Sequence, residues 1–181
     1  MKKGINAILI SLLAVTLCTG CAGLNKRIDE RRTERKKEIE EGYEAAREAA
    51  FGGHYRFLAT RVYPGSGYPS RDIGGGSYFL SVDAYDVKAV LPFYGTQYMA
   101  DRPASPGIRI DGKMENIMIE ESDRRHRVLI RFSVRSGNDN YLVYLDIGPD
   151  FNANLSISSS KRSTITYSGK VIATEEEEEE R

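Results

Sequence analysis

Cys21 is the residue whose surroundings predict the most specific chemistry, the attachment of lipid to a thiol. It follows an apolar stretch, residues 5–17, that two lysines precede. Small residues lead into Cys21, the pattern that a bacterial lipoprotein signal peptidase cuts. Gly20 fits the cleavage position, whereas a leucine precedes Cys18. We therefore predict cleavage after residue 20 and acylation of Cys21 by chains such as palmitate.

The predicted anchor also indicates a location. One acyl chain holds a protein only marginally at a membrane, but two or more hold it durably. The apolar stretch of residues 5–17 is too short to cross a bilayer, which needs roughly 20 residues. Ala22 follows the cysteine, in place of the aspartate that commonly retains such proteins at the inner membrane. We expect a lipid-anchored protein of the outer membrane that faces the periplasm.

Several kinds of chemistry are disfavoured. Both cysteines lie in the signal or at its end, so the processed chain has no free thiol. The histidines, His54 and His126, are far apart in the sequence and are expected in solvated positions, which disfavours a zinc site. The 26 basic residues balance 26 acidic ones, which argues against a nucleic-acid partner. We expect no metal and no cofactor.

Five residues form the candidate ligand-binding set. Tyrosines at several positions alternate with the aliphatic rows of the predicted strands, and arginines accompany them. The set is Tyr94, Tyr98, Arg131, Arg135 and Tyr144. Packing across strands explains most tyrosines by itself. The sharper alternative is a tyrosine-lined groove that binds a sugar, a peptide or a lipid head group.

Carboxylates are placed singly, without a visible acid–base pair. Asp83, Asp111 and Asp146 are the candidates, and Asp111 is more readily explained as closing a type I′ turn with Gly112. We therefore predict a non-enzymatic module that binds an envelope protein, glycan or lipid. The alternatives are an enzyme that acts on an envelope polymer and a proteinaceous inhibitor or assembly factor.

Residues 24–51 predict a charged helix, because lysine, arginine, glutamate and alanine dominate and are good helix formers. Apolar residues recur near helical spacing only in its second half, where we expect them to dock on a sheet. They are Tyr43, Ala46, Ala50 and Phe51. Glycines at 52 and 53 end the helix. A coiled-coil dimer is the alternative, although heptad positions are not sustained.

After residue 54 the apolar period changes to two. The clearest row is Val128, Ile130, Phe132 and Val134, which alternates with polar residues. Short strands joined by turns, without helices between them, predict an all-β fold. We expect an antiparallel up-and-down barrel or half-barrel of about eight strands, with lipocalin-like topology and the charged helix before it, because a curved sheet hides its edges.

These observations divide the chain into four parts. Residues 1–20 are the signal peptide, and residues 21–53 are the tether and charged helix. Residues 54–174 form the β domain. The glutamate run in residues 175–181 repels itself, so a disordered acidic tail is expected.

Four short motifs, in this order and spacing, are similar to a family of Bacteroidetes lipoproteins known as domain of unknown function 4251. They are Leu91-Pro92-Phe93-Tyr94-Gly95, Ile110-Asp111-Gly112, Phe132-Ser133-Val134-Arg135 and Ile165-Thr166-Tyr167-Ser168-Gly169. The resemblance covers residues 45–173. It implies a secreted, lipid-anchored, mostly antiparallel β domain without a known activity, and it supplies no catalytic residues.

Overall fold

A computed structural model describes residues 28–65, 68–75, 77–98 and 107–174. Contacts divide the chain into two units, residues 1–39 and residues 40–181. The described part of the N-terminal helix covers residues 28–52, so its second half belongs to the second unit. The predicted helix is confirmed over its described residues. Within the described chain, no helix has the length and apolarity needed to cross a membrane.

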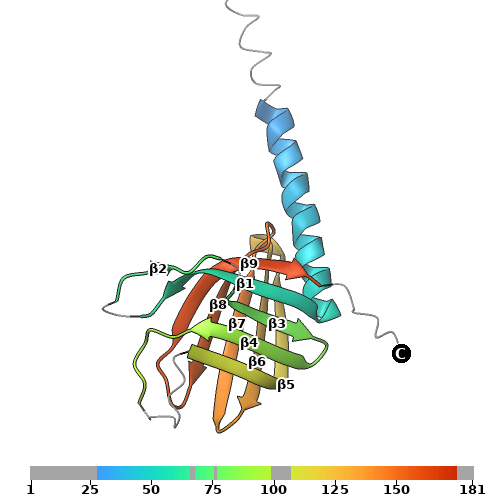
Figure 1. Ribbon diagram of the computed structural model, residues 1–181. Coiled ribbons are helices and arrows are strands. Elements are labelled where there is room, and N and C mark those ends of the chain that lie inside the picture. Colours follow the sequence, from blue (N-terminus) through green and yellow to red (C-terminus); the bar gives the residue numbers. More distant parts are fainter. Residues whose placement is uncertain (1–27, 66–67, 76, 99–106, 175–181) are drawn as a thin grey trace, which may run out of the picture. The chain divides into compact units, whose positions relative to one another are not determined.

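The strands form one closed antiparallel barrel (Figure 1). They are β1 (His54–Tyr63), β2 (Arg71–Asp72), β3 (Phe79–Asp83), β4 (Asp86–Pro92), β5 (Gly107–Ser122), β6 (Arg127–Ser136), β7 (Asp139–Ile147), β8 (Asn152–Ser159) and β9 (Ile165–Ala173). From β3 onward each strand pairs with the next, and β1 pairs with both β3 and β9. The two-residue β2 only extends the pairing of β1. The predicted up-and-down barrel of eight strands is confirmed, and it is closed.

The interior of the barrel is filled by side chains. The alternating row of β6 is buried along its length, with Val128, Ile130, Phe132 and Val134 at most 1% exposed. The largest inward side chains come from nearly every strand: Tyr55, Phe57, Leu80, Leu91, Ile108, Ile130, Phe132, Leu145, Leu155, Ile157 and Tyr167. Each such burial contributes about 1.5–3 kcal/mol to stability. These side chains occupy the space in which a hollow barrel would hold a ligand.

Because successive strands run in opposite directions, their connections alternate between the two ends of the barrel. The helix end carries the short turns 84–85, 123–126 and 148–151, and the loop end carries the connections 64–78, 93–106, 137–138 and 160–164. Both long connections therefore lie at the loop end.

The second half of the N-terminal helix closes the helix end. Its buried face is Tyr43, Ala46 and Ala50, which are at most 4% exposed. This spacing places the three side chains on one face of a helix. The predicted docking is confirmed for them, but it is wrong for Phe51, which is 57% exposed. One position beyond Ala50 points away from the buried face, so Phe51 meets water.

The closing helix reaches all three turns of the helix end. The Tyr43 hydroxyl donates a hydrogen bond to an Asp123 carboxylate oxygen at 2.8 Å. A Cβ added to Gly42 would lie 2.0 Å from the Pro149 carbonyl oxygen, so the helix backbone packs directly on that turn. The backbone N–H of Ala84 donates to the Gly53 carbonyl at 3.0 Å.

The predicted turn at Asp111 and Gly112 is wrong, because both residues lie inside the continuous strand β5. Gly112 serves a close approach between strands: a Cβ there would lie 2.4 Å from the Arg135 carbonyl oxygen. The Asp111 N–H donates to the Ser136 hydroxyl at 3.0 Å. An Asp-Gly pair is compatible with a tight turn and also with a close approach between strands. The residue types alone therefore do not distinguish the two.

Candidate functional site

The structure brings together one pair of the predicted binding residues. Arg131 of β6 and Tyr144 of β7 are direct cross-strand neighbours on the outer wall. Arg135 lies four residues farther along β6 on the same face, which is about 13 Å at the rise of a strand. Arg131 and Arg135 are both exposed. These three residues form a strand-wall group on β6 and β7.

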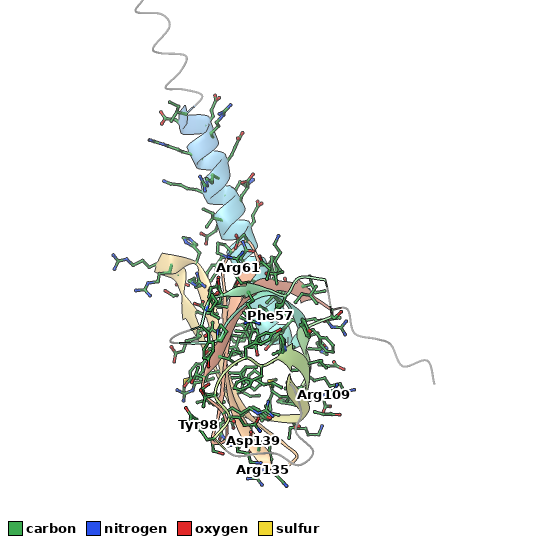
Figure 2. All side chains as sticks on the ribbon, turned by 60° about the vertical axis from the view of Figure 1, so that its left-hand side comes forward. Phe57, Arg61, Tyr98, Arg109, Arg135 and Asp139 are labelled. Carbon is green, nitrogen blue, oxygen red and sulfur yellow. The ribbon has the colours of Figure 1, made fainter. Side chains whose placement is uncertain are left out.

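The other two predicted residues lie on the connection after β4, at the loop end. The Arg71 guanidinium lies 4.9 Å from the centre of the Tyr94 ring, a cation–π contact. Tyr98 is 66% exposed, and its N–H donates to the Lys161 carbonyl at 2.8 Å. Figure 2 shows Tyr98 and Arg135 at the same end of the barrel. Three of the five residues therefore lie on strands β6 and β7, and two lie on the connection after β4.

Two charged residues beneath the loop end escaped the sequence analysis. Arg162 is 4% exposed and Asp139 is 5% exposed. One Arg162 guanidinium N–H donates to the Gly107 carbonyl at 2.6 Å, and the guanidinium lies 5.2 Å from the Phe93 ring centre. The sequence gives only a weak signal that Arg162 is buried, because this residue lies in a polar turn, where arginine is usually solvated.

A buried tyrosine completes the polar closure of the loop end. The Tyr167 hydroxyl donates to the Pro92 carbonyl at 2.7 Å. Burial holds the pKa of Tyr167 above its ordinary value, so this phenol stays neutral and donating. Tyr167 and Arg162 therefore satisfy carbonyls on either side of the long 93–106 connection, which fixes both of its ends.

A groove on the outer wall has a volume of about 470 Å³. Strands β1, β3, β4 and β5 form its floor with their outward-facing residues. The groove lining, which we call the polar groove, is His54, Arg56, Phe79, Ser81, Val82, Asp83, Asp86, Lys88, Asp111 and Thr174. Three acidic and two basic side chains share this surface, so it presents both signs of charge.

Contacts within the polar groove hold its side chains in place. His54 Nδ1 lies 2.8 Å from an Asp83 carboxylate oxygen. The Arg56 guanidinium lies 5.3 Å from the centre of the Phe79 ring. Lys113, beside the groove, donates to Asp86 at 2.9 Å. These pairs are exposed and contribute little to stability, so their charges remain accessible to a partner.

The candidate carboxylates are divided between two places. Asp83 and Asp111 both line the polar groove. Asp146 lies on β7 and accepts a hydrogen bond from Arg127 at 2.6 Å. No cluster of three histidine, aspartate or glutamate side chains suited to a metal ion occurs within the part of the chain that the structure describes.

Both histidines were expected to be solvated, but in the structure each one contacts an acidic side chain. His54 is the first residue of β1 and pairs with Asp83. His126 follows the short 3-10 helix Asp123–Arg125 with a φ of 51°, and its Nε2 lies 3.1 Å from a Glu40 carboxylate oxygen. Its ring also meets the Tyr43 ring edge-on, with centroids 5.6 Å apart. His126 therefore contacts the closing helix through both Glu40 and Tyr43.

Cys21, the predicted lipid attachment site, lies outside the described residues, as does the glutamate tail. The lipid anchor therefore remains a prediction from the sequence.

Comparison with known proteins identifies the class. The barrel is closed and filled, with an exposed polar groove on its outer wall and without a described catalytic set. The family model described as Domain of unknown function (DUF4251) matches residues 37–171, so the chain belongs to this family.

A crystal structure of a DUF4251 family protein from Bacteroides eggerthii is similar in fold, with a TM-score of 0.59 at 20% sequence identity. The similarity covers 73% of this chain and 87% of that one. At this identity it shows the fold alone. The comparison with curated proteins finds no match.

Proposed function

We propose that the protein is a lipid-anchored, non-enzymatic module of the cell envelope that binds a protein partner through the polar groove. The observation that carries this proposal is the contrast between a filled interior and an exposed groove of about 470 Å³ on the outer wall. The packed centre of the barrel offers no central calyx for a small apolar ligand. A groove with both signs of charge suits a polar peptide segment, because complementary charges steer and orient a partner.

The anchor is the first element to test. Cys21→Ala is expected to abolish processing and to move the protein from the membrane to the soluble fraction, because the acyl chains supply the membrane affinity. Cys18→Ala is the matched control and should leave both unchanged. Membrane partitioning of Cys21→Ala like that of the unchanged chain would remove the anchor from this proposal.

The groove is tested by crosslinking in intact cells. A photo-crosslinking side chain at Lys88, inside the polar groove, should yield a discrete adduct with an envelope protein. The same group at Lys170, which is exposed on β9, is the control and should not. Charge reversal by Asp111→Lys should abolish the Lys88 adduct. Equal adducts from both positions, or an adduct that survives the charge reversal, would count against the groove.

One observation favours a second candidate, an enzyme that acts on an envelope polymer. Asp83 and Asp111 line the same groove, and His54 contacts Asp83. A carboxylate with a histidine partner is a common acid–base arrangement. Turnover of peptidoglycan or envelope glycans that disappears in both Asp83→Asn and Asp111→Asn would support this candidate. Absence of turnover by the unchanged protein would dismiss it.

A further inference from the structure

The wall of the barrel opens at the helix end, between β4 and β5. Pairing between these strands stops at Asp86 and Lys113, whereas β5 continues to Ser122 with β6 as its strand neighbour. A hollow of about 290 Å³ occupies this opening, between the end of the closing helix and the 84–85 turn. Its lining shares no residue with that of the polar groove.

The lining of this hollow is apolar. Of the residues that form it, Phe51, Tyr85 and Ile117 are 57%, 62% and 39% exposed, and Ile119 and Ile130 lie deeper. Charged side chains are absent from its described lining. Clustered exposed apolar side chains of this kind mark a binding surface more often than isolated ones do.

A β-bulge directs the isoleucines of β5 into the hollow. Inward positions of β5 are even-numbered up to Met114 and odd-numbered from Ile117, because the register shifts between Glu115 and Met118. Asn116 takes up the shift with a φ of 54°. Its side-chain amide donates to the Ser133 hydroxyl at 3.0 Å. Bulges often redirect side chains at functional positions.

Tyr55 supplies a buried hydroxyl at this hollow, whose other lining side chains, apart from Tyr85, are apolar. The residue is 1% exposed and lines the hollow. Its hydroxyl is buried and has no hydrogen-bond partner among the described residues. Burial raises the pKa of Tyr55, so the hydroxyl keeps its proton. A buried hydroxyl without a partner is destabilising, and a ligand with a hydrogen-bonding atom would relieve that cost.

The end of the closing helix determines the charge that the site accepts. Residues 50–53, at the C-terminal end of the helix, line the hollow. The carboxyl end of a helix carries partial negative charge and disfavours an anion. Since the described lining offers no cation to compensate, a neutral ligand fits better than a carboxylate.

We propose that this hollow binds a small neutral amphipathic molecule, with its aliphatic part against Ile117 and Ile119 and its oxygen hydrogen-bonded to the Tyr55 hydroxyl. The site is independent of the polar groove. The two proposals can therefore fail separately.

The test uses the processed chain, residues 21–181, with Cys21→Ser so that it dissolves without detergent, and 1-octanol as the probe. Titration followed by methyl NMR should shift the Ile117, Ile119 and Ile130 signals in a saturable way. Tyr55→Phe should weaken binding about fivefold, the worth of one hydrogen bond, and should still fold because it removes an unpaired group. Octanoate at pH 8 should bind less tightly than 1-octanol.

Two variants make the location of the site decisive. Ile117→Glu places a charge at the hollow and should abolish binding. Ile172→Glu, at a residue 45% exposed on β9, is the matched control and should bind as the unchanged chain does. Octanol shifts that do not saturate, equal affinity in Tyr55→Phe, octanoate binding as tight as octanol, or binding that survives Ile117→Glu would each overturn the proposal.

Discussion

The two ends of the barrel are closed by different physical means. At the helix end, small and apolar residues of the closing helix pack on the barrel, and the buried face of that helix carries only one hydroxyl, that of Tyr43. At the loop end, a buried guanidinium and a buried phenol donate to backbone carbonyls near the long 93–106 connection. Apolar packing with a few hydrogen bonds, such as that of Tyr43 to Asp123, closes the helix end, whereas buried hydrogen bonds from Arg162 and Tyr167 hold the loop end.

This difference indicates how each end tolerates change. Because apolar packing closes the helix end, a hollow can remain there without leaving a charge unpaired. The hollow lined by Tyr55 is such a case. A closure built on a buried charge loses more when its partner is removed, because the remaining polar groups are left without bonds. The helix end is thus suited to admit a ligand, and the loop end to hold its connections.

The largest effect is expected at the loop end. Arg162→Met should lower the free energy of unfolding by about 3 kcal/mol, since the Gly107 carbonyl loses its donor and Phe93 loses its cation. Urea unfolding of both proteins measures this. The control Arg135→Met changes an exposed arginine and should stay within about 0.5 kcal/mol. Similar losses in both variants would contradict the assigned role of Arg162.

The next largest effect tests how the closing helix packs on the 148–151 turn. Alanine normally stabilises a helix interior relative to glycine by about 1 kcal/mol. Gly42→Ala should instead destabilise the protein by about 2 kcal/mol, because the new Cβ would meet the Pro149 carbonyl oxygen at 2.0 Å. Thermal or urea unfolding gives the sign directly.

Gly52→Ala is the control for Gly42→Ala, because a Cβ at Gly52 has no atom within 4 Å. It should be neutral or slightly stabilising. If Gly42→Ala also stabilised the protein, the helix would not rest on the 148–151 turn as described.

The smallest effect concerns the Tyr43 hydroxyl. Tyr43→Phe should cost about 1 kcal/mol at neutral pH, the usual contribution of one hydrogen bond, because the bond to Asp123 is lost. The same substitution also reports on pH. Burial and the hydrogen bond to Asp123 raise the pKa of Tyr43 to about 12.

The sign of this pH effect follows from the unfolded state, in which tyrosine ionises near pH 10. As pH rises from about 10 to 12, the unfolded chain releases the Tyr43 proton while the folded chain keeps it. The Tyr43 contribution is therefore complete below pH 10 and lost toward pH 12. Unfolding free energies measured across this range should fall less steeply for Tyr43→Phe, and identical slopes would place the Tyr43 phenol in water.

Much of the fold was predictable because its strongest signals are local. Alternation along Val128–Val134 places one face inward in any curved sheet, since successive side chains of a strand point to opposite faces. The helix was predictable from composition in the same way. The turn assigned to Asp111 and Gly112 failed because glycine serves both turns and close approaches, and only the neighbouring strand distinguishes the two.

The candidate sites were less predictable, because they depend on which strands become neighbours. Asp83 and Asp111 are 28 positions apart in the sequence, yet they share the polar groove through the β3–β4–β5 order. The predicted tyrosine and arginine set is likewise divided between strands β6 and β7 and the connection after β4. Composition gave no warning that Arg162 is buried, since burial is a property of the assembled loop end.

By itself, the sequence determined the period of the strands and the N-terminal helix, because each depends on residues close together in the chain. The lipid attachment at Cys21 rests on such a local pattern too and stays a prediction. Only the tertiary structure decided that the barrel closes through β1 and β9 and that its interior is filled. It also decided that the Tyr55 hydroxyl, beside a hollow, has no hydrogen-bond partner among the described residues. These features arise from contacts between distant segments, and their free energy depends on the volume and partners that the whole fold provides.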